Sequence, residues 1–332
     1  MKSHIFRFIM YALLLCIVVF LFNIFFPRSY NVPKLQKRAG TQFWNLLTGS
    51  KIAYTLVSAK GEKKPYAIIY LHGGPGGHVT DRDIEMLSPL SDDGYDVYLY
   101  DQIGSGQSDR LENINEYTVE RHVKDLEEII TKTGLEKVIL IGQSWGAILA
   151  VLFTANNPGK VEKIIFTSPG PVFPVRRELA NLKAPDSFHL RNPVFTNAQG
   201  NEKANNIRTK AMKIFATVFG KRLATDKEAD DFETYLNYEV NKSTVCDTSK
   251  LLQAKAGCGF YAEVMTFKSL IKVQDPRLKI RNSKIQVLVI KGQCDNQKWS
   301  FTNEYLELFP NHQLTIIPNA GHFISVEQRN FT

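Results

Sequence analysis

The stretch Val138-Ile-Leu-Ile-Gly142-Gln-Ser144-Trp-Gly146 decides how this chain folds. An apolar, β-branched run ends at Gly142, and an apolar segment with several small residues, 145–157, follows at once. This order places Ser144 on a sharp turn from a strand into a helix, with a glycine two residues to either side. The glycines let strand and helix approach without Cβ clashes, and backbone N–H groups at the helix start favour negative charge. The pattern predicts that Ser144 is an activated nucleophile; an ordinary turn serine is the alternative.

Similar apolar runs recur on both sides of this stretch, at 66–72, 96–101, 161–167, 284–292 and 313–318. Continuous apolar strands are typical of a sheet that is covered on both faces, and such sheets are mostly parallel. Between them lie helical patterns, such as 118–133 with its single apolar stripe. We therefore predict an α/β fold with a doubly wound, mostly parallel sheet, formed by residues 49–170 and 278–332. Residues 171–277 are richer in charge and helical in period, which predicts an inserted helical cap.

The N-terminal segment 8–26 is uncharged and almost wholly apolar. As a helix it would be about 28 Å long, close to the thickness of a bilayer core. We predict a transmembrane helix that anchors the protein within residues 1–27, followed by a polar linker over 28–48. A cleaved signal peptide is the alternative, although no small-x-small cleavage site follows the run. The side of the membrane stays open, because the basic residues after the run favour a cytoplasmic body while the short N-terminal tail favours the opposite.

The net charge of +8 is confined to this N-terminal region. Residues 1–60 hold eight Lys or Arg and no Asp or Glu, so the other 33 basic residues balance the 33 acidic ones. The excess charge flanks the apolar run, where attraction to a membrane surface explains it, and we expect no nucleic-acid partner. Among the cysteines, Cys246 and Cys258 could pair in an oxidising compartment or remain free buried thiols, and Cys294 is expected in the core.

A serine nucleophile needs a general base, and the base needs an acid that orients it. On this type of strand–turn–helix site the chain order is Ser, then Asp or Glu, then His. His322 lies in a loop just after the last predicted strand, and Asp295 follows the strand before it. We predict His322 as the base and Asp295 as the acid; a structural histidine and a surface aspartate are the alternatives.

The loop His72-Gly-Gly-Pro-Gly-Gly77 follows another predicted strand end. A loop of this composition exposes backbone N–H groups, and we predict that those of Gly74 and Trp145 form an oxyanion hole. A plain tight turn is the alternative. The chain lacks a Gly-Lys-Ser/Thr phosphate loop and a His-Glu-x-x-His or paired-cysteine metal motif, so we expect no cofactor and no metal.

Three motifs together, His72–Gly77, Asp101-Gln-Ile-Gly-Ser-Gly-Gln-Ser108 and Gly142–Gly146, resemble the proline iminopeptidase family of α/β-hydrolases, whose loops have the sequences HGGPGG, DQRGxGxS and GxSWG. The resemblance covers most of 50–170 and resumes at 284–324, and Ile103 replaces the family's common arginine. It implies an α/β-hydrolase fold with a helical cap after the sixth core strand. It also implies a serine aminopeptidase that releases N-terminal proline or another small apolar residue from peptides with a free N-terminus.

The same family binds the substrate's α-amino group through carboxylates of the cap. Tyr235-Leu-Asn-Tyr238-Glu239 is similar to the family's W-x-x-W-E stretch with Tyr for Trp, and Glu263 is the nearest match to a second cap glutamate. The resemblance therefore implies that Glu239 and Glu263 bind the ammonium group, which is costly to bury without anions. Solvated helix faces are the alternative for both glutamates.

These expectations add up to a membrane-anchored serine hydrolase that works through an acyl-enzyme. Two other functions stay open from the residues alone. One is a membrane-associated carboxylesterase or lipase of the same fold, whose cap would present an apolar acyl tunnel. The other is a membrane-tethered binding module without activity, which the complete nucleophile, base and acid set argues against.

Overall fold

The computed structural model describes residues 2–251, 253 and 255–328. Within them, one sheet of eight strands has the order β1-β2-β4-β3-β5-β6-β7-β8. The strands are β1 (Gln42–Asn45), β2 (Lys51–Val57), β3 (Ala67–Leu71), β4 (Val97–Tyr100), β5 (Val138–Gln143), β6 (Val161–Thr167), β7 (Gln286–Gly292) and β8 (His312–Ile317). Only the pairs β1–β2 and β2–β4 are antiparallel. The remaining pairs are parallel, which confirms the α/β class and the mostly parallel sheet.

The strands at the centre of the sheet are buried because helices pack against them. Every residue of β3 and β5 is buried. The helix after β5, α4 (Trp145–Asn156), is apolar all round and buried along most of its length, so it belongs to the core. The other helices of the core are α2 (Asp81–Leu87), α3 (Val119–Thr133), α10 (Trp299–Leu308) and α11 (Ile324–Glu327). Thr118 caps the start of α3 by accepting a hydrogen bond from the Arg121 N–H.

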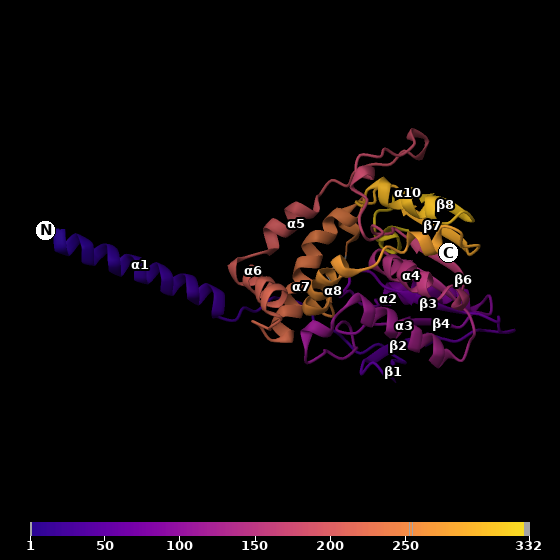
Figure 1. Ribbon diagram of the computed structural model, residues 1–332, viewed down its shortest axis with the longest axis horizontal. Helices are drawn as coiled ribbons and strands as arrows, with labels where there is room; N and C mark the ends of the chain where they lie inside the picture. The colour runs from indigo at the N-terminus through magenta and orange to yellow at the C-terminus, as the bar shows by residue number, and fades with distance from the viewer. Residues whose placement is uncertain (1, 252, 254, 329–332) are drawn as a thin grey trace.

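The residues between β6 and β7 form helices and loops, with no strand in the part that the structure describes. Figure 1 shows the labelled helices of this segment on the side of the molecule from which the N-terminal helix projects. They are α5 (Asn197–Ala204), α6 (Ile207–Ile214), the π-helical turn η6 (Phe215–Phe219), α7 (Asp226–Val240), α8 (Phe260–Ser269) and α9 (Arg277–Ile280). We call this segment the cap. Short 3₁₀ turns join its helices.

The sheet begins earlier than the sequence indicated, because β1 lies inside the stretch 28–48 that was expected to be a linker. Trp44 of β1 stacks on Tyr54 of β2 with ring centroids 3.6 Å apart. Arg38, also in that stretch, is buried and pairs with Asp101 through two hydrogen bonds. Aromatic stacking and a buried ion pair thus fix the second half of the expected linker to the core.

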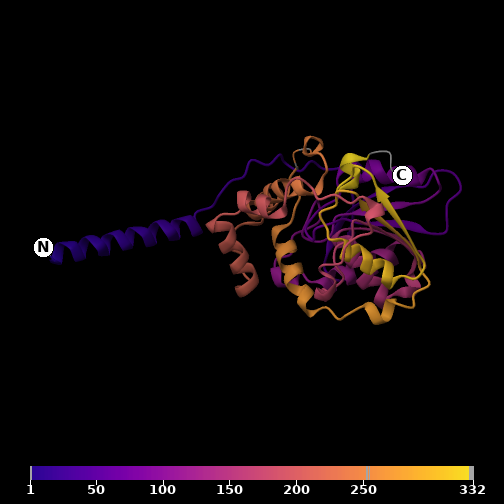
Figure 2. The same ribbon diagram turned by 90° about the horizontal axis from the view of Figure 1, so that it is seen from above.

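The N-terminal helix α1 (Lys2–Phe25) projects away from the rest of the molecule (Figures 1 and 2). Its residues His4–Phe25 are long and apolar enough to cross a membrane, and none of the most apolar window is buried. The chain after it packs onto the cap. The backbone N–H of Arg28 donates to Glu228 at 2.8 Å, and Arg208 donates to the carbonyl oxygen of Ile24 at 2.6 Å. The end of α1 is therefore attached to the cap.

Candidate active site

Ser144 occupies a sharp turn between β5 and α4. Its backbone angles, φ 53° and ψ −111°, lie where residues with a side chain are strained. The two flanking glycines are required by close approach. A Cβ at Gly142 would lie 2.6 Å from the carbonyl oxygen of Gly146, and one at Gly146 would lie 1.9 Å from that of Leu71. The expected strand–turn–helix geometry is present, and it presents Ser144 at the start of a buried helix.

Asp295 and His322 meet, as the sequence led us to expect. His322 Nδ1 lies 2.8 Å from Asp295 Oδ1, and both side chains are buried. The contact arises because Asp295 follows β7 and His322 follows β8, which are parallel neighbours whose carboxyl ends share one edge of the sheet. A proton donated from Nδ1 to the carboxylate leaves Nε2 as the basic nitrogen of the imidazole.

Ser144 leaves the same edge of the sheet as these two residues. Its backbone N–H donates to Thr167 at the end of β6, and the N–H of Ser168 donates to Ile290 of β7. In the part of the chain that the structure describes, the Ser144 hydroxyl has no hydrogen-bond partner. Contacts of this kind often close only when substrate is bound. The pairing of Ser144 with His322 is therefore part of our proposal below.

Lys291 is a member of this site that the sequence analysis missed. Its Nζ lies 2.8 Å from Asp295 Oδ2 and 2.9 Å from the carbonyl oxygen of Gln297, and its side chain is 1% exposed. Burial opposes ionisation of Asp295, but the charges of Lys291 and His322 outweigh it and hold the pKa of Asp295 well below its usual range. The only sequence signal was a lysine inside an otherwise apolar strand, four residues before the aspartate.

The glycine loop packs directly against the serine turn. A Cβ at Gly73 would lie 3.3 Å from the Cβ of Ser144, so the two turns are in close contact. The N–H groups of Gly74 and Trp145, which we expect to form the oxyanion hole, donate to no other group among the described residues. Both N–H groups are therefore unpaired within the described residues, as an oxyanion hole requires.

Gln102 joins the three motifs of this site. Its backbone N–H donates to His72 Nε2 at 2.9 Å, and its side-chain amide donates to the His72 carbonyl oxygen at 3.0 Å. Its side-chain oxygen accepts from Trp145 Nε1 at 2.8 Å. Burial lowers the pKa of His72 to about 4, so this imidazole is neutral near pH 7 and accepts a hydrogen bond. Gln102 and His72 thus fix the glycine loop beside Ser144.

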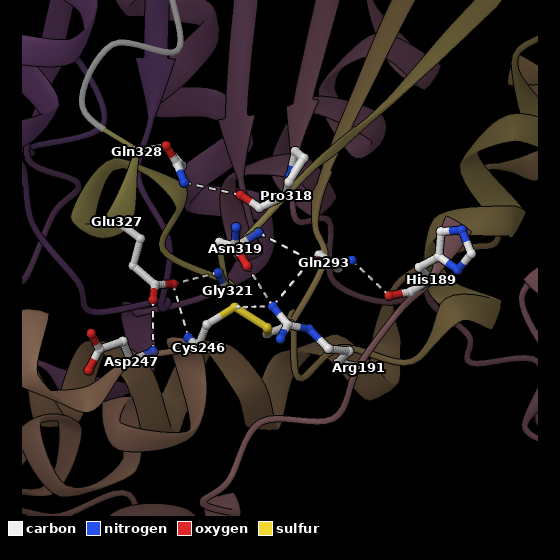
Figure 3. The surroundings of a disulfide bond; sticks show 11 residues. His189, Arg191, Cys246, Asp247, Gln293, Pro318, Asn319, Gly321, Glu327 and Gln328 are labelled. Carbon is white, nitrogen blue, oxygen red and sulfur yellow. Dashed lines mark hydrogen bonds between the residues drawn. A yellow bond between two sulfur atoms is a disulfide. The ribbon is translucent and has the colours of Figure 1, made fainter. Parts of the chain in front are cut away.

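A disulfide joins the cap to the strand end that carries Asp295. Cys246 pairs with Cys294, with Cα atoms 5.4 Å apart, and Cys258 is a buried free thiol. Cys294 is therefore a bonded residue and not simply a core residue, and the possible Cys246–Cys258 pair is not formed. Figure 3 shows this disulfide among polar contacts that connect the cap to the loop of His322. Sequence spacing could not select the pairing, because Cys246 and Cys294 are 48 residues apart.

Glu327 makes a second connection between the cap and that loop (Figure 3). Its carboxylate accepts from the backbone N–H of Gly321 at 2.7 Å, next to His322. It also accepts from the N–H groups of Cys246 at 3.0 Å and Asp247 at 2.8 Å. The loop of the predicted base is thereby held against the cap.

The two cap glutamates singled out from the sequence do not lie together. Glu239 forms ion pairs with Lys203 at 3.0 Å and with Lys242. Although burial opposes it, these lysines lower the pKa of Glu239. Both of its oxygens are committed to lysines of the cap, so the structure does not bring Glu239 to Glu263.

Glu263 instead meets Glu233, which the sequence analysis did not single out. Glu233 is buried and Glu263 is half-buried, and Asn237 donates to Glu233 Oε1 at 3.0 Å. Burial and the adjacent Glu263 raise the pKa of Glu233 well above its usual value, and burial also raises the pKa of Glu263. The raised pKa values show that the environment of these two carboxyl groups disfavours two negative charges without a cation.

The carboxyl pair lies next to the glycine loop. A Cβ at Gly76 would lie 3.0 Å from the Cβ of Glu263, and the N–H of Gly259, just before α8, donates to the Gly76 carbonyl oxygen at 2.7 Å. The start of α8 therefore packs on the loop that carries Gly74. This arrangement places the carboxyl group of Glu263 on the side of the cap that packs against the expected oxyanion hole.

Residues 66–328 match the family model of the alpha/beta hydrolase fold. The chain belongs to this family. Within it, the chain is similar to proline iminopeptidases, as the three motifs indicated. It is 36% identical over 123 residues to the proline iminopeptidase of Lactobacillus helveticus. This aligned region covers 36% of this chain and 40% of that protein. The chain is 32% identical over 146 residues to the proline iminopeptidase of Saccharolobus solfataricus, which covers 42% of this chain and 45% of that protein.

The matched region thus spans about two fifths of the length of these relatives. Among solved structures, the esterase from Exiguobacterium antarcticum has a TM-score of 0.55 at 20% identity, with 85% of this chain and 92% of that chain covered. The proline iminopeptidase of Mycobacterium smegmatis has a TM-score of 0.53 at 16% identity, with 85% and 91% covered. These likenesses show the shared fold.

Proposed function

We propose that this protein is a membrane-anchored serine aminopeptidase that releases an N-terminal proline or another small apolar residue from peptides. The observation that carries the proposal is the pair of neighbouring carboxyl groups, buried Glu233 and half-buried Glu263, beside the glycine loop, since it can bind the free amine that only a chain end offers. The relatives named proline iminopeptidase support the same substrate class.

In the proposed mechanism, Ser144 attacks the first peptide carbonyl while His322 takes its proton. Asp295 holds the imidazole in the tautomer with a proton on Nδ1, through the 2.8 Å contact. The N–H groups of Gly74 and Trp145 stabilise the oxyanion. His322 then protonates the leaving amine, and water hydrolyses the acyl-enzyme in a second cycle of the same steps.

Lys291 acts in this mechanism as a positioning residue. It keeps Asp295 ionised and fixes one of its carboxylate oxygens, so that the other points at His322.

Amine recognition in this proposal moves from Glu239 to Glu233, while Glu263 keeps the role that the resemblance implied. Without substrate the two carboxyl groups share a proton. A substrate ammonium replaces that proton and ion-pairs with both groups, so substrates without a free amine lose this contact. The requirement for an ammonium restricts cleavage to the first residue of a peptide.

The anchor and its sidedness complete the proposal. The α1 helix crosses the membrane, and Arg28 and Arg208 attach its end to the cap through the hydrogen bonds described above. A disulfide between Cys246 and Cys294 persists in an oxidising compartment, which favours a catalytic body outside the cytoplasm with the short N-terminal tail inside.

A substrate panel on the purified full chain in detergent tests this function. The panel contains proline and alanine arylamides, the same compounds with blocked amines, and short- and long-chain fatty-acyl esters. We expect turnover of the free arylamides and little turnover of the blocked ones, with Ser144→Ala reduced to the small residual rate of the oxyanion hole. Preference for long-chain esters, with no discrimination against blocked amines, would favour the esterase or lipase alternative.

A further inference from the structure

The cap carries an exposed apolar stripe on α6 and η6. Its members are more than two-fifths exposed: Ile207 at 47%, Ile214 at 51%, Val218 at 67% and Phe219 at 61%. The spacing of seven and then four residues from Ile207 to Ile214 and Val218 puts these three on one face of a continuous helix. We call these four residues, with Lys210, Lys213 and Lys221, the α6 face. An apolar stripe of this kind in water calls for a covering partner.

The charged residues within the segment that carries the stripe have one sign. Residues 203–225 contain six Lys or Arg and no Asp or Glu. Three of the six, Lys203, Arg208 and Arg222, form ion pairs within the described protein. Lys210, Lys213 and Lys221 form no ion pair with a described carboxylate. Three unpaired lysines next to exposed aliphatic and aromatic side chains are typical of a helix that lies on an anionic lipid surface.

The α6 face is continuous with the end of α1. Phe25, the last residue of α1, packs edge-on against Phe215 of η6 with ring centroids 6.4 Å apart. Arg208 of α6 is buried, ion-pairs with Glu228 and donates to the carbonyl oxygen of Ile24. Figure 1 shows α6 on the side of the molecule from which α1 leaves. A membrane that α1 spans would therefore end next to this face.

We infer that the α6 face docks on the surface of the bilayer that α1 crosses. The inference rests on the proposed anchor and goes beyond the proposed activity. The apolar stripe enters the boundary between headgroups and acyl chains, and the three lysines contact anionic phosphate groups. The cap, with Glu233 and Glu263, is then held against the membrane rather than tumbling on a linker. Leu278 on α9 is 73% exposed and also has basic neighbours, Arg277 and Lys279, but α9 packs on α4, whereas α6 packs on the anchor helix α1.

Tryptophan quenching by brominated phospholipids tests the inference on the full chain. Phe219→Trp and the control Leu278→Trp are each reconstituted into vesicles of brominated phosphatidylcholine and phosphatidylglycerol. The control position is matched in exposure, but α9 packs on α4. We expect the emission added by the tryptophan at position 219 to be weaker in brominated than in non-brominated vesicles. The emission added by the tryptophan at position 278 should be the same in both.

No quenching of the Phe219→Trp variant, or equal quenching of both variants, would overturn the inference. Flotation of the vesicles separates it from the anchor: protein that does not float contradicts the anchor and this docking together, whereas floating protein without quenching contradicts the docking alone. Lys210→Gln with Lys221→Gln, added to Phe219→Trp, should weaken the quenching in anionic but not in zwitterionic vesicles. An unchanged result there would overturn the part assigned to anionic headgroups.

Discussion

Lys291 Nζ lies 2.8 Å from Asp295 Oδ2, and both side chains are buried from solvent. The other oxygen of the same carboxylate holds His322 at 2.8 Å. A buried lysine thus stands directly behind the proposed acid, and its charge holds the pKa of that carboxyl group down. The ion pair between Lys291 and Asp295 explains how a fully buried carboxylate stays ionised.

Lys291→Gln should lower kcat/KM by at least tenfold, which corresponds to about 1.4 kcal/mol of transition-state stabilisation. The acid limb of the kcat/KM profile should also move to higher pH, because the pKa of Asp295 rises when the lysine charge that holds it down is lost. A pH–rate profile with proline arylamide checks this. A drop in melting temperature with an unshifted profile would show that Lys291 serves stability alone.

Glu233→Gln should reduce aminopeptidase turnover by about 100-fold, mainly through KM, since one ion pair to the substrate ammonium is lost. Hydrolysis of short acyl esters should change little, because they do not use the amine site. The matched control is Glu239→Gln on the same helix, whose carboxylate binds lysines of the cap; it should keep its aminopeptidase activity. The reverse ranking of the two variants would contradict the role of Glu233.

The same Glu233→Gln substitution should stabilise the protein at neutral pH. The pKa of Glu233 is raised by folding, so the folded protein holds its proton more tightly than the unfolded chain. This carboxyl group therefore costs stability as pH rises above its unfolded pKa of about 4.3, and the cost levels off above the folded pKa. Melting temperatures of variant and parent should converge near pH 4 and diverge toward pH 8. A constant difference across this range would contradict the raised pKa.

Replacing both Cys246 and Cys294 with serine should destabilise the protein by up to about 4 kcal/mol, the loop-closure value for a cross-link of this span. Activity should fall as well, since the bond holds the cap at the strand end that carries Asp295. Thermal unfolding with and without a reductant measures the effect in the parent. The control is Cys258→Ala, which removes a buried thiol that is not part of a disulfide. This control should respond to the reductant as the parent does, whereas the double serine variant should not respond. A parent protein insensitive to the reductant would mean that the bond contributes nothing.

The fold and the catalytic triad candidates could be predicted because their signals are local. Strand ends, glycines that a close approach requires, and short motifs such as that around Ser144 are each visible in a few consecutive residues. The three motifs also constrain one another, since Gln102 bonds to His72 and to Trp145. Their joint presence therefore indicated one site before any geometry was known.

The features that were missed depend on contacts between distant segments. On α7, Glu233 and Glu239 are six residues apart, so their side chains differ by about 240° around the helix axis. The match to the family's aromatic spacing selected Glu239, but the face of α7 that lies near Glu263 carries Glu233 instead. Lys291 was indistinguishable from a strand lysine that reaches solvent, and the partner of Cys246 could be found only from the position of the cap. Spacing along the chain carries little information about such pairs.

The most direct test of the central claim is reaction of the full chain with a fluorophosphonate, followed by mass spectrometry of the labelled peptides. Ser144, His322 and Asp295 should act as one unit. We therefore predict a single adduct on Ser144 in the parent, and strongly reduced labelling in His322→Ala and Asp295→Asn. Labelling of another serine, or equal labelling of Ser144 in the absence of His322, would contradict the account.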